Sequence, residues 1–131
     1  MLSRRSLIAI ALTTSAFTAT VASAADDIRP FTSADFAAAQ KAGRPILIEI
    51  HADWCPTCKA QAPIISDLRK QARFKDLMVM RVDFDGQKDA VKRFGARSQS
   101  TLITFKGNSE TGRSVGDTGK ASIEALLAKA I

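Results

Sequence analysis

Apolar residues follow two spacings along this chain, one typical of strands and one typical of helices. Runs of mostly apolar, β-branched residues with the length of strands occupy positions 46–50, 77–83 and 101–105. Between and after these runs, apolar positions recur at helical spacing, which predicts helices over about 33–42, 56–73, 88–94 and 119–131. A short extended segment around residues 28–31 precedes the first helix.

The order of these elements predicts an α/β fold. Two buried strands joined by a helix are expected to be parallel, with a right-handed crossover. The turn at Gly107 and Asn108 instead predicts a hairpin, so that residues 111–115 run antiparallel to the preceding strand. The result is a mixed central sheet with helices on both faces. The last helix is expected to bury one side, formed by Ile123, Leu126, Leu127 and Ile131.

The two cysteines of the chain, Cys55 and Cys58, lie where the first long strand ends and a helix begins. The free N–H groups and the positive dipole end of a helix N-terminus stabilise a thiolate, which lowers the pKa of a cysteine from about 8.5 toward roughly 3.5–7.5. Pro56 fits the first helical turn, where its missing N–H donor is not needed. We therefore expect Cys55 to be the nucleophile of a redox-active pair and Cys58 to be the shielded resolving cysteine.

Two other uses of the cysteine pair are less consistent with the sequence. A structural disulfide closing so short a loop would add only on the order of 2 kcal/mol of stability. A closed zinc site needs a second pair of ligands, and only His51 is left to supply one. The alternative that stays open is a non-catalytic soft-metal protein, in which Cys55, Cys58 and His51 hold Cu(I), an ion suited to thiolate and imidazole ligands.

The segment Trp54-Cys55-Pro56-Thr57-Cys58-Lys59 resembles the active site of the thioredoxin superfamily. The resemblance continues through Pro63, Val82-Asp83, Phe94-Gly95 and residues 101–107, and it covers essentially all of the chain after the leader. It implies the thioredoxin fold and exchange of dithiols and disulfides with protein substrates, with no cofactor. It further implies a redox partner that recharges the cysteine pair.

Glu49 interrupts an apolar strand that should be buried on both faces. A buried carboxylate without a partner is costly, so this residue needs a specific role. The family carries a buried acid at the matching position, and the resemblance implies that Glu49 passes protons to and from Cys58. A structural ion pair with Arg81, on the neighbouring strand, is the other interpretation, and the two roles are compatible.

The resemblance also suggests where a protein substrate binds. Trp54 matches the tryptophan that flanks the nucleophile, and substrate contact is further implied for Ser100 and Thr101. Here the chain departs from its family, which has a cis-proline directly before the threonine, whereas this chain has Ser100. Because the surrounding spacing is kept, we expect a cis peptide before Ser100, although that geometry costs about 2.5–4 kcal/mol without proline.

The N-terminal residues form a unit of their own. Basic residues are followed by an apolar stretch, small residues and an Ala22-Ser23-Ala24 cleavage site, which predicts a signal peptide over 1–24 and a thioredoxin-like domain over 25–131. We therefore expect a periplasmic monomer that is not inserted in the membrane after cleavage. The formal charge of +6 is dispersed among acidic residues, which argues against a nucleic-acid partner.

Overall fold

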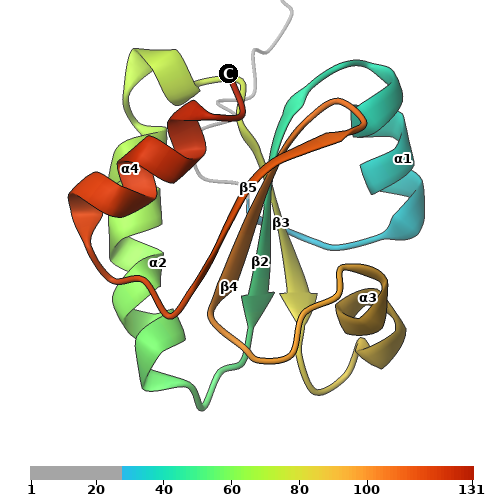
Figure 1. Ribbon diagram of the computed structural model, residues 1–131, viewed down its shortest axis with the longest axis vertical. Coiled ribbons are helices and arrows are strands. Elements are labelled where there is room, and N and C mark those ends of the chain that lie inside the picture. The colour runs from blue at the N-terminus through green and yellow to red at the C-terminus, as the bar shows by residue number, and fades with distance from the viewer. Residues whose placement is uncertain (1–27) are drawn as a thin grey trace, which may run out of the picture.

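The computed structural model describes residues 28–131, which form one sheet and the helices that cover it (Figure 1). The predicted signal peptide and the first three residues of the predicted domain lie outside these residues. The elements are β1 (Ile28–Pro30), α1 (Ser33–Lys41), β2 (Pro45–His51), α2 (Pro56–Arg69), the 3-10 helix η2 (Ala72–Phe74), β3 (Met78–Asp83), α3 (Lys88–Arg93), β4 (Thr101–Lys106), β5 (Ser109–Val115) and α4 (Lys120–Ala128).

The strands form a mixed sheet in the order β1-β3-β2-β4-β5. The helical crossover through α2 makes β3 parallel to β2, and β1 is also parallel to β3. The tight turn after β4 makes β5 antiparallel to β4, and β4 runs antiparallel to β2. The predicted α/β class with a mixed sheet is thereby confirmed.

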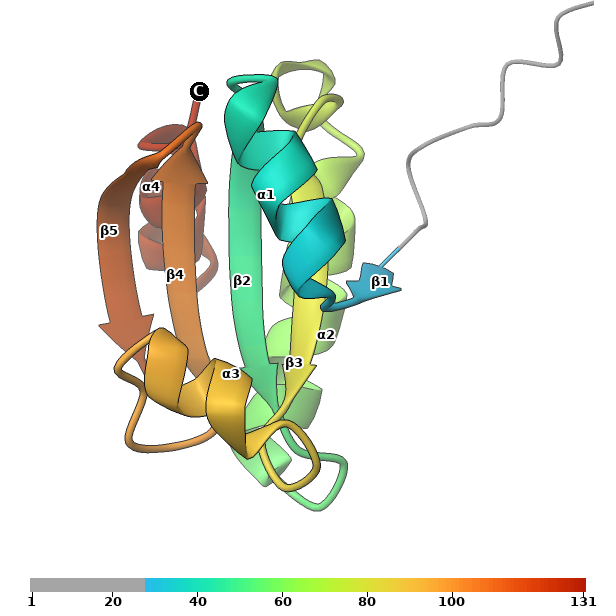
Figure 2. The ribbon, with the colours of Figure 1, turned by 90° about the vertical axis from the view of Figure 1, so that its right-hand side faces the viewer.

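Helices cover both faces of the sheet, with α1 and α3 on one side and α2 and α4 on the other (Figure 2). Alternation along β2 supplies both cores, since Ile46, Ile48 and Ile50 face the first layer and Leu47 faces the second. Four phenylalanines, Phe31, Phe36, Phe94 and Phe105, pack edge to face or tilted in the first core. The second core joins Leu47 to the apolar sides of α2 and α4. Glu49 also belongs to this second face, because it lies two residues after Leu47.

Several helix ends follow from local chemistry. The Thr32 hydroxyl accepts a hydrogen bond from the Asp35 backbone N–H at 3.0 Å and caps α1. After α1 the chain turns at Gly43, whose φ of +69° suits a glycine. Two expectations were wrong. The helix after the cysteines ends at Arg69, four residues early, and is followed by η2. Ile131 is 43% exposed instead of buried.

Across residues 28–131, no helix combines the length and the apolar character that crossing a membrane would require. This finding concerns the domain only, because the predicted leader is not among the described residues.

Candidate active site

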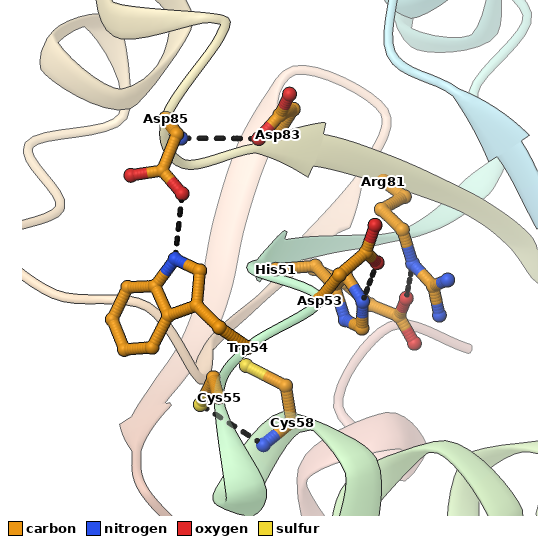
Figure 3. Close-up of polar contacts among 9 residues, drawn as sticks. His51, Asp53, Trp54, Cys55, Cys58, Arg81, Asp83 and Asp85 are labelled. Atoms are coloured by element: carbon orange, nitrogen blue, oxygen red, sulfur yellow. Dashed lines mark hydrogen bonds and ion pairs between the residues drawn. The ribbon is translucent and has the colours of Figure 1, made fainter.

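The two cysteines occupy the junction between β2 and α2, as the sequence predicts. Cys55 is the N-cap residue of α2, and its Sγ accepts a hydrogen bond from the Cys58 backbone N–H at 3.2 Å (Figure 3). Pro56 is the first residue of the helix. The Cys55 sulfur therefore lies where unpaired backbone donors and the helix dipole both favour negative charge.

Exposure does not distinguish the two sulfurs. Both cysteines are free thiols, with only 1% of Cys55 and 2% of Cys58 exposed. Cys58 is shielded, as expected, and Cys55 is covered to the same extent in the reduced protein. The difference between the two thiols has to come from the groups that surround each sulfur.

Those groups move the two pKa values in opposite directions. Burial raises the pKa of Cys55, but hydrogen bonds from the Cys58 side chain, from the backbone of Cys58 and Thr57, and from the Gln99 side chain outweigh it, so the pKa is lowered overall. Burial also raises the pKa of Cys58, and the thiol bond with Cys55 and the charge of Cys55 raise it further. Backbone hydrogen bonds from Ala52 and Ser100 offset only part of this increase. Of the two sulfurs, Cys55 therefore forms its thiolate more readily than Cys58.

Glu49 forms a partly buried ion pair across neighbouring strands. It is directly opposite Arg81 in the β2–β3 register, and Arg81 Nε donates to Glu49 Oε2 at 3.0 Å. Only 4% of Glu49 is exposed, and its second oxygen, Oε1, has no hydrogen-bond partner among the described residues. The predicted ion pair with Arg81 is confirmed. It leaves one carboxylate oxygen available to accept a proton.

His51 does not join the cysteines in a metal site. Its Nε2 lies 3.1 Å from Oδ1 of the exposed Asp53. Within residues 28–131, no group of three or more histidine, cysteine, aspartate or glutamate side chains is arranged to hold a metal ion. The soft-metal alternative built on Cys55, Cys58 and His51 is therefore not favoured. His51 instead lines a cavity of about 340 Å³ together with Arg81 and Asp83.

Trp54 presents an apolar surface directly before Cys55. The residue is 57% exposed, and its indole Nε1 donates to Asp85 Oδ2 at 2.7 Å (Figure 3). Asp85 follows β3, and its own backbone N–H donates to the Asp83 carboxylate at 3.0 Å. The ring is thus held in place by its polar edge while its apolar surface stays open to solvent.

The peptide before Ser100 is trans, because residues 28–131 contain no cis peptide bond. The expected cis geometry is wrong. Ser100 instead adopts a φ of +57°, in the left-handed region that costs a non-glycine residue about 1–2 kcal/mol. Its N–H donates to the Ile50 carbonyl of β2 at 2.7 Å, and its carbonyl accepts from the Gly116 N–H, just after β5, at 2.9 Å. The backbone at this position therefore has a trans peptide and a left-handed serine in place of the expected cis geometry.

Hydroxyl groups of this loop are used within the loop itself. Ser100 Oγ donates to the Gln99 carbonyl at 2.6 Å, and Thr101 Oγ1 donates to the Ser98 carbonyl at 2.8 Å. Thr101 is buried.

Gln61 is a polar residue of the site that the sequence reasoning missed. It lies on α2 and is 4% exposed, and its Nε2 donates to the carbonyls of Ser100 and Asp117. The signal was its position three residues after Cys58, which places both side chains on one face of the helix.

A buried dithiol with one acidified sulfur, at a strand–helix junction of a mixed sheet, defines a thiol–disulfide oxidoreductase. The thioredoxin family model matches residues 27–129, and the chain belongs to the thioredoxin family. A thioredoxin from Alicyclobacillus acidocaldarius is 31% identical over 97 residues, which cover 74% of this chain and 91% of that protein.

Solved structures agree with this assignment. The structure of Trxlp from Edwardsiella tarda EIB202 is 39% identical, with a TM-score of 0.75 over 77% of this chain and 98% of that one. A mutant thioredoxin from Halobacterium salinarum NRC-1, at 21% identity, has a TM-score of 0.72 over 84% of this chain and 95% of its own. The second likeness concerns the fold alone.

Proposed function

We propose that this oxidoreductase exchanges disulfides with protein substrates through attack by Cys55 and resolution by Cys58. The observation that carries the proposal is the position of Cys55 as the N-cap residue of α2, where its Sγ accepts from the Cys58 N–H at 3.2 Å. The groups around the sulfurs lower the pKa of Cys55 and raise that of Cys58, which agrees with this position. The thiolate is the attacking species in thiol–disulfide exchange, so the acidified sulfur reacts first.

Reduction of a substrate disulfide takes two steps. The Cys55 thiolate attacks one sulfur of a substrate disulfide, which forms a mixed disulfide and releases the other substrate sulfur as a thiolate that takes up a proton. Cys58 then loses its proton and attacks Cys55 Sγ, which forms the Cys55–Cys58 disulfide and releases the second substrate thiolate. Two electrons pass to the substrate, and the reverse sequence oxidises a substrate dithiol.

Cys58 needs a proton acceptor in the second step because its raised pKa keeps it protonated. We assign that role to Glu49, which lies on the sheet face covered by α2 and has one oxygen, Oε1, without a partner among residues 28–131. Its partner Arg81 lines the 340 Å³ cavity, which gives the proton a route to solvent. Glu49 thus combines the ion pair with proton transfer.

The substrate is expected to dock beside Trp54. An exposed indole next to a buried nucleophile offers apolar contact to an unfolded or extended protein segment. The adjoining surface is the loop before β4. Substrate contact by Ser100 and Thr101 stays a prediction, because the Ser100 N–H and carbonyl are already bonded within the protein.

Trapping of mixed disulfides tests the order of attack. With Cys58→Ser, the first step proceeds and the second does not, so the purified protein should accumulate a covalent adduct with insulin. Cys55→Ser should give none, because its remaining thiol has a raised pKa and lacks the helix-terminal donors. Equal trapping by both variants, or trapping by Cys55→Ser alone, would contradict the assignment.

We further propose that the protein works in the periplasm. The support is the leader pattern, with basic residues, an apolar stretch and the Ala22-Ser23-Ala24 site. Full-length protein produced in a Gram-negative host should be recovered from the periplasmic fraction with Ala25 as its first residue. Recovery of the uncleaved chain from the cytoplasm would overturn this proposal.

A further inference from the structure

Gln61 is a buried polar residue on a helix face that is otherwise apolar. The side chains farther along this face, Ile65 and Leu68, belong to the core beneath α2. Gln61 follows Cys58 by one helical turn, so the two side chains point toward the same part of the molecule. A buried carboxamide is unfavourable unless it is hydrogen-bonded, which makes the partners of Gln61 informative.

Both partners are backbone carbonyls from segments distant in the sequence. Gln61 Nε2 donates to the Ser100 carbonyl at 3.3 Å and to the Asp117 carbonyl at 2.9 Å. The amide group has two N–H donors, and the two bonds use both. One side chain on α2 therefore connects the turn before β4 to the loop after β5.

The turn that Gln61 holds has a demanding conformation. Ser100 is a non-glycine residue with a positive φ, and its N–H and carbonyl are also bonded to β2, at Ile50, and to Gly116. A left-handed serine persists only where its surroundings impose it. The hydrogen bond from Gln61 also connects Ser100 to α2, the helix that carries Cys58.

We propose that Gln61 is a positioning residue for the cysteine pair, holding the left-handed Ser100 turn against the two sulfurs. The inference rests on the proposed function of Cys55 and Cys58. It is carried by the burial of Gln61, by its two bonds to distant carbonyls, and by its place one turn after Cys58.

The turn matters because it carries donors to both sulfurs. A hydrogen bond from the Gln99 side chain is among the causes that lower the pKa of Cys55, and one from the Ser100 backbone acts against the raised pKa of Cys58. A turn that moves away from the sulfurs withdraws both donors. The Cys55 thiolate then becomes less stable, and the equilibrium between the reduced dithiol and the Cys55–Cys58 disulfide shifts toward the disulfide.

Gln61→Met tests the proposal, since methionine has a similar length and no donor. The matched control is Thr104→Val in β4, which removes a fully buried hydroxyl that donates to the Gly112 carbonyl at 3.4 Å and accepts from Thr111 Oγ1 at 3.0 Å. For both variants we would measure the pH midpoint of Cys55 alkylation, the equilibrium with a glutathione redox buffer, and urea unfolding.

Gln61→Met should raise the alkylation midpoint and shift the equilibrium toward the Cys55–Cys58 disulfide by a factor of about three to ten, the usual effect of losing one hydrogen bond. Thr104→Val should lose stability without moving either quantity. Wild-type values of both quantities in Gln61→Met would overturn the proposal, because a merely structural role changes unfolding alone.

Two safeguards keep the test decisive. If Gln61→Met does not fold, Gln61→Asn, which keeps the carboxamide but is too short to bridge both carbonyls, is judged by the same two quantities. Both quantities use small thiols, so they remain measurable even if the protein fails to trap insulin. That failure would contradict the proposed function and leave the positioning role to be decided by the midpoint and the equilibrium.

Discussion

Cys55 and Cys58 carry the same thiol group at almost the same burial, and they differ in the hydrogen bonds that reach each sulfur. The Cys55 sulfur accepts hydrogen bonds from the backbone of Thr57 and Cys58 at the start of α2. Cys58 lies one turn inside the helix, and its thiol bonds to the side chain of Cys55. Position along the helix thus contributes to the opposite shifts of the two pKa values.

The first prediction concerns the pH dependence of alkylation. Because the pKa of Cys55 is lowered from the ordinary 9.0, its thiolate forms below pH 9.0, and its reaction rate should reach half of its maximum below that pH. The pKa of Cys58 is raised, so its midpoint should lie above pH 9.0. Peptide mass mapping after brief iodoacetamide treatment of the reduced protein measures both. Preferential labelling of Cys58 at neutral pH would contradict this assignment of thiolate and thiol.

A second prediction at this scale concerns Ser100. Ser100→Pro should lower the free energy of unfolding by more than about 1 kcal/mol, because proline requires a φ near −65° and removes the N–H that bonds to Ile50. Ser100→Gly is the control, since glycine adopts positive φ without steric cost and keeps the N–H.

Urea unfolding of the reduced proteins distinguishes the two substitutions. A proline variant as stable as the parent would show that the loop can adopt the geometry of the family, contrary to the structure. A glycine variant that unfolds far more easily would show that the serine hydroxyl, and not the backbone, supports the turn.

At the scale of elements, pairing of β2 with β3 brings an acid and a base together in the sheet. Glu49 and Arg81 occupy opposite positions in a parallel register, so the ion pair follows directly from strand alignment. Its location on the α2 side also places the carboxylate beneath the helix that carries Cys58. The same pairing therefore serves both the ion pair and the proposed proton transfer.

The third prediction tests the proton-transfer role. Glu49→Gln should slow turnover of a protein disulfide by about 10²-fold, in the usual range for a lost acid–base group. The amide oxygen can still accept from Arg81 Nε, so the loss of stability should be small. Steady-state kinetics and urea unfolding measure the two effects. Unchanged turnover would show that Glu49 has no role in proton transfer and serves only in its ion pair with Arg81.

Much of the fold could be predicted from the sequence because buried strands and helix faces leave strong periodic signals. The runs at 46–50 and 101–105 became the interiors of β2 and β4. Chain ends were less predictable. Ile131 has helical spacing, but α4 ends at Ala128, and Ala130 takes the buried position instead.

The site was predictable where chemistry is local, and it was not where contacts are distant. The position of the cysteine pair at a strand–helix junction is a local feature, and its prediction was confirmed. The conformation of Ser100 depends on Ile50, Gly116 and Gln61, which belong to three other segments. No local pattern encodes those contacts, so the family's cis geometry was the wrong expectation.

At the scale of the whole molecule, the fold brings the reactive features to one end of the sheet. The end of β2, the start of α2, the loop after β3 and the turn before β4 meet around the sulfurs, with Trp54 exposed beside them. The direction of electron flow in the cell depends on the reduction potential of this pair relative to its compartment and on the partner that recharges it.

Catalysed reduction of insulin, with dithiothreitol as the final reductant, tests the central claim most directly. We predict that the wild-type protein accelerates the reaction, that Cys55→Ser abolishes the acceleration, and that Cys58→Ser is slower than wild type because its mixed disulfide has to be reduced by dithiothreitol. Sustained turnover by Cys55→Ser, or no acceleration by the folded wild-type protein, would contradict the claim that Cys55 and Cys58 form the catalytic pair.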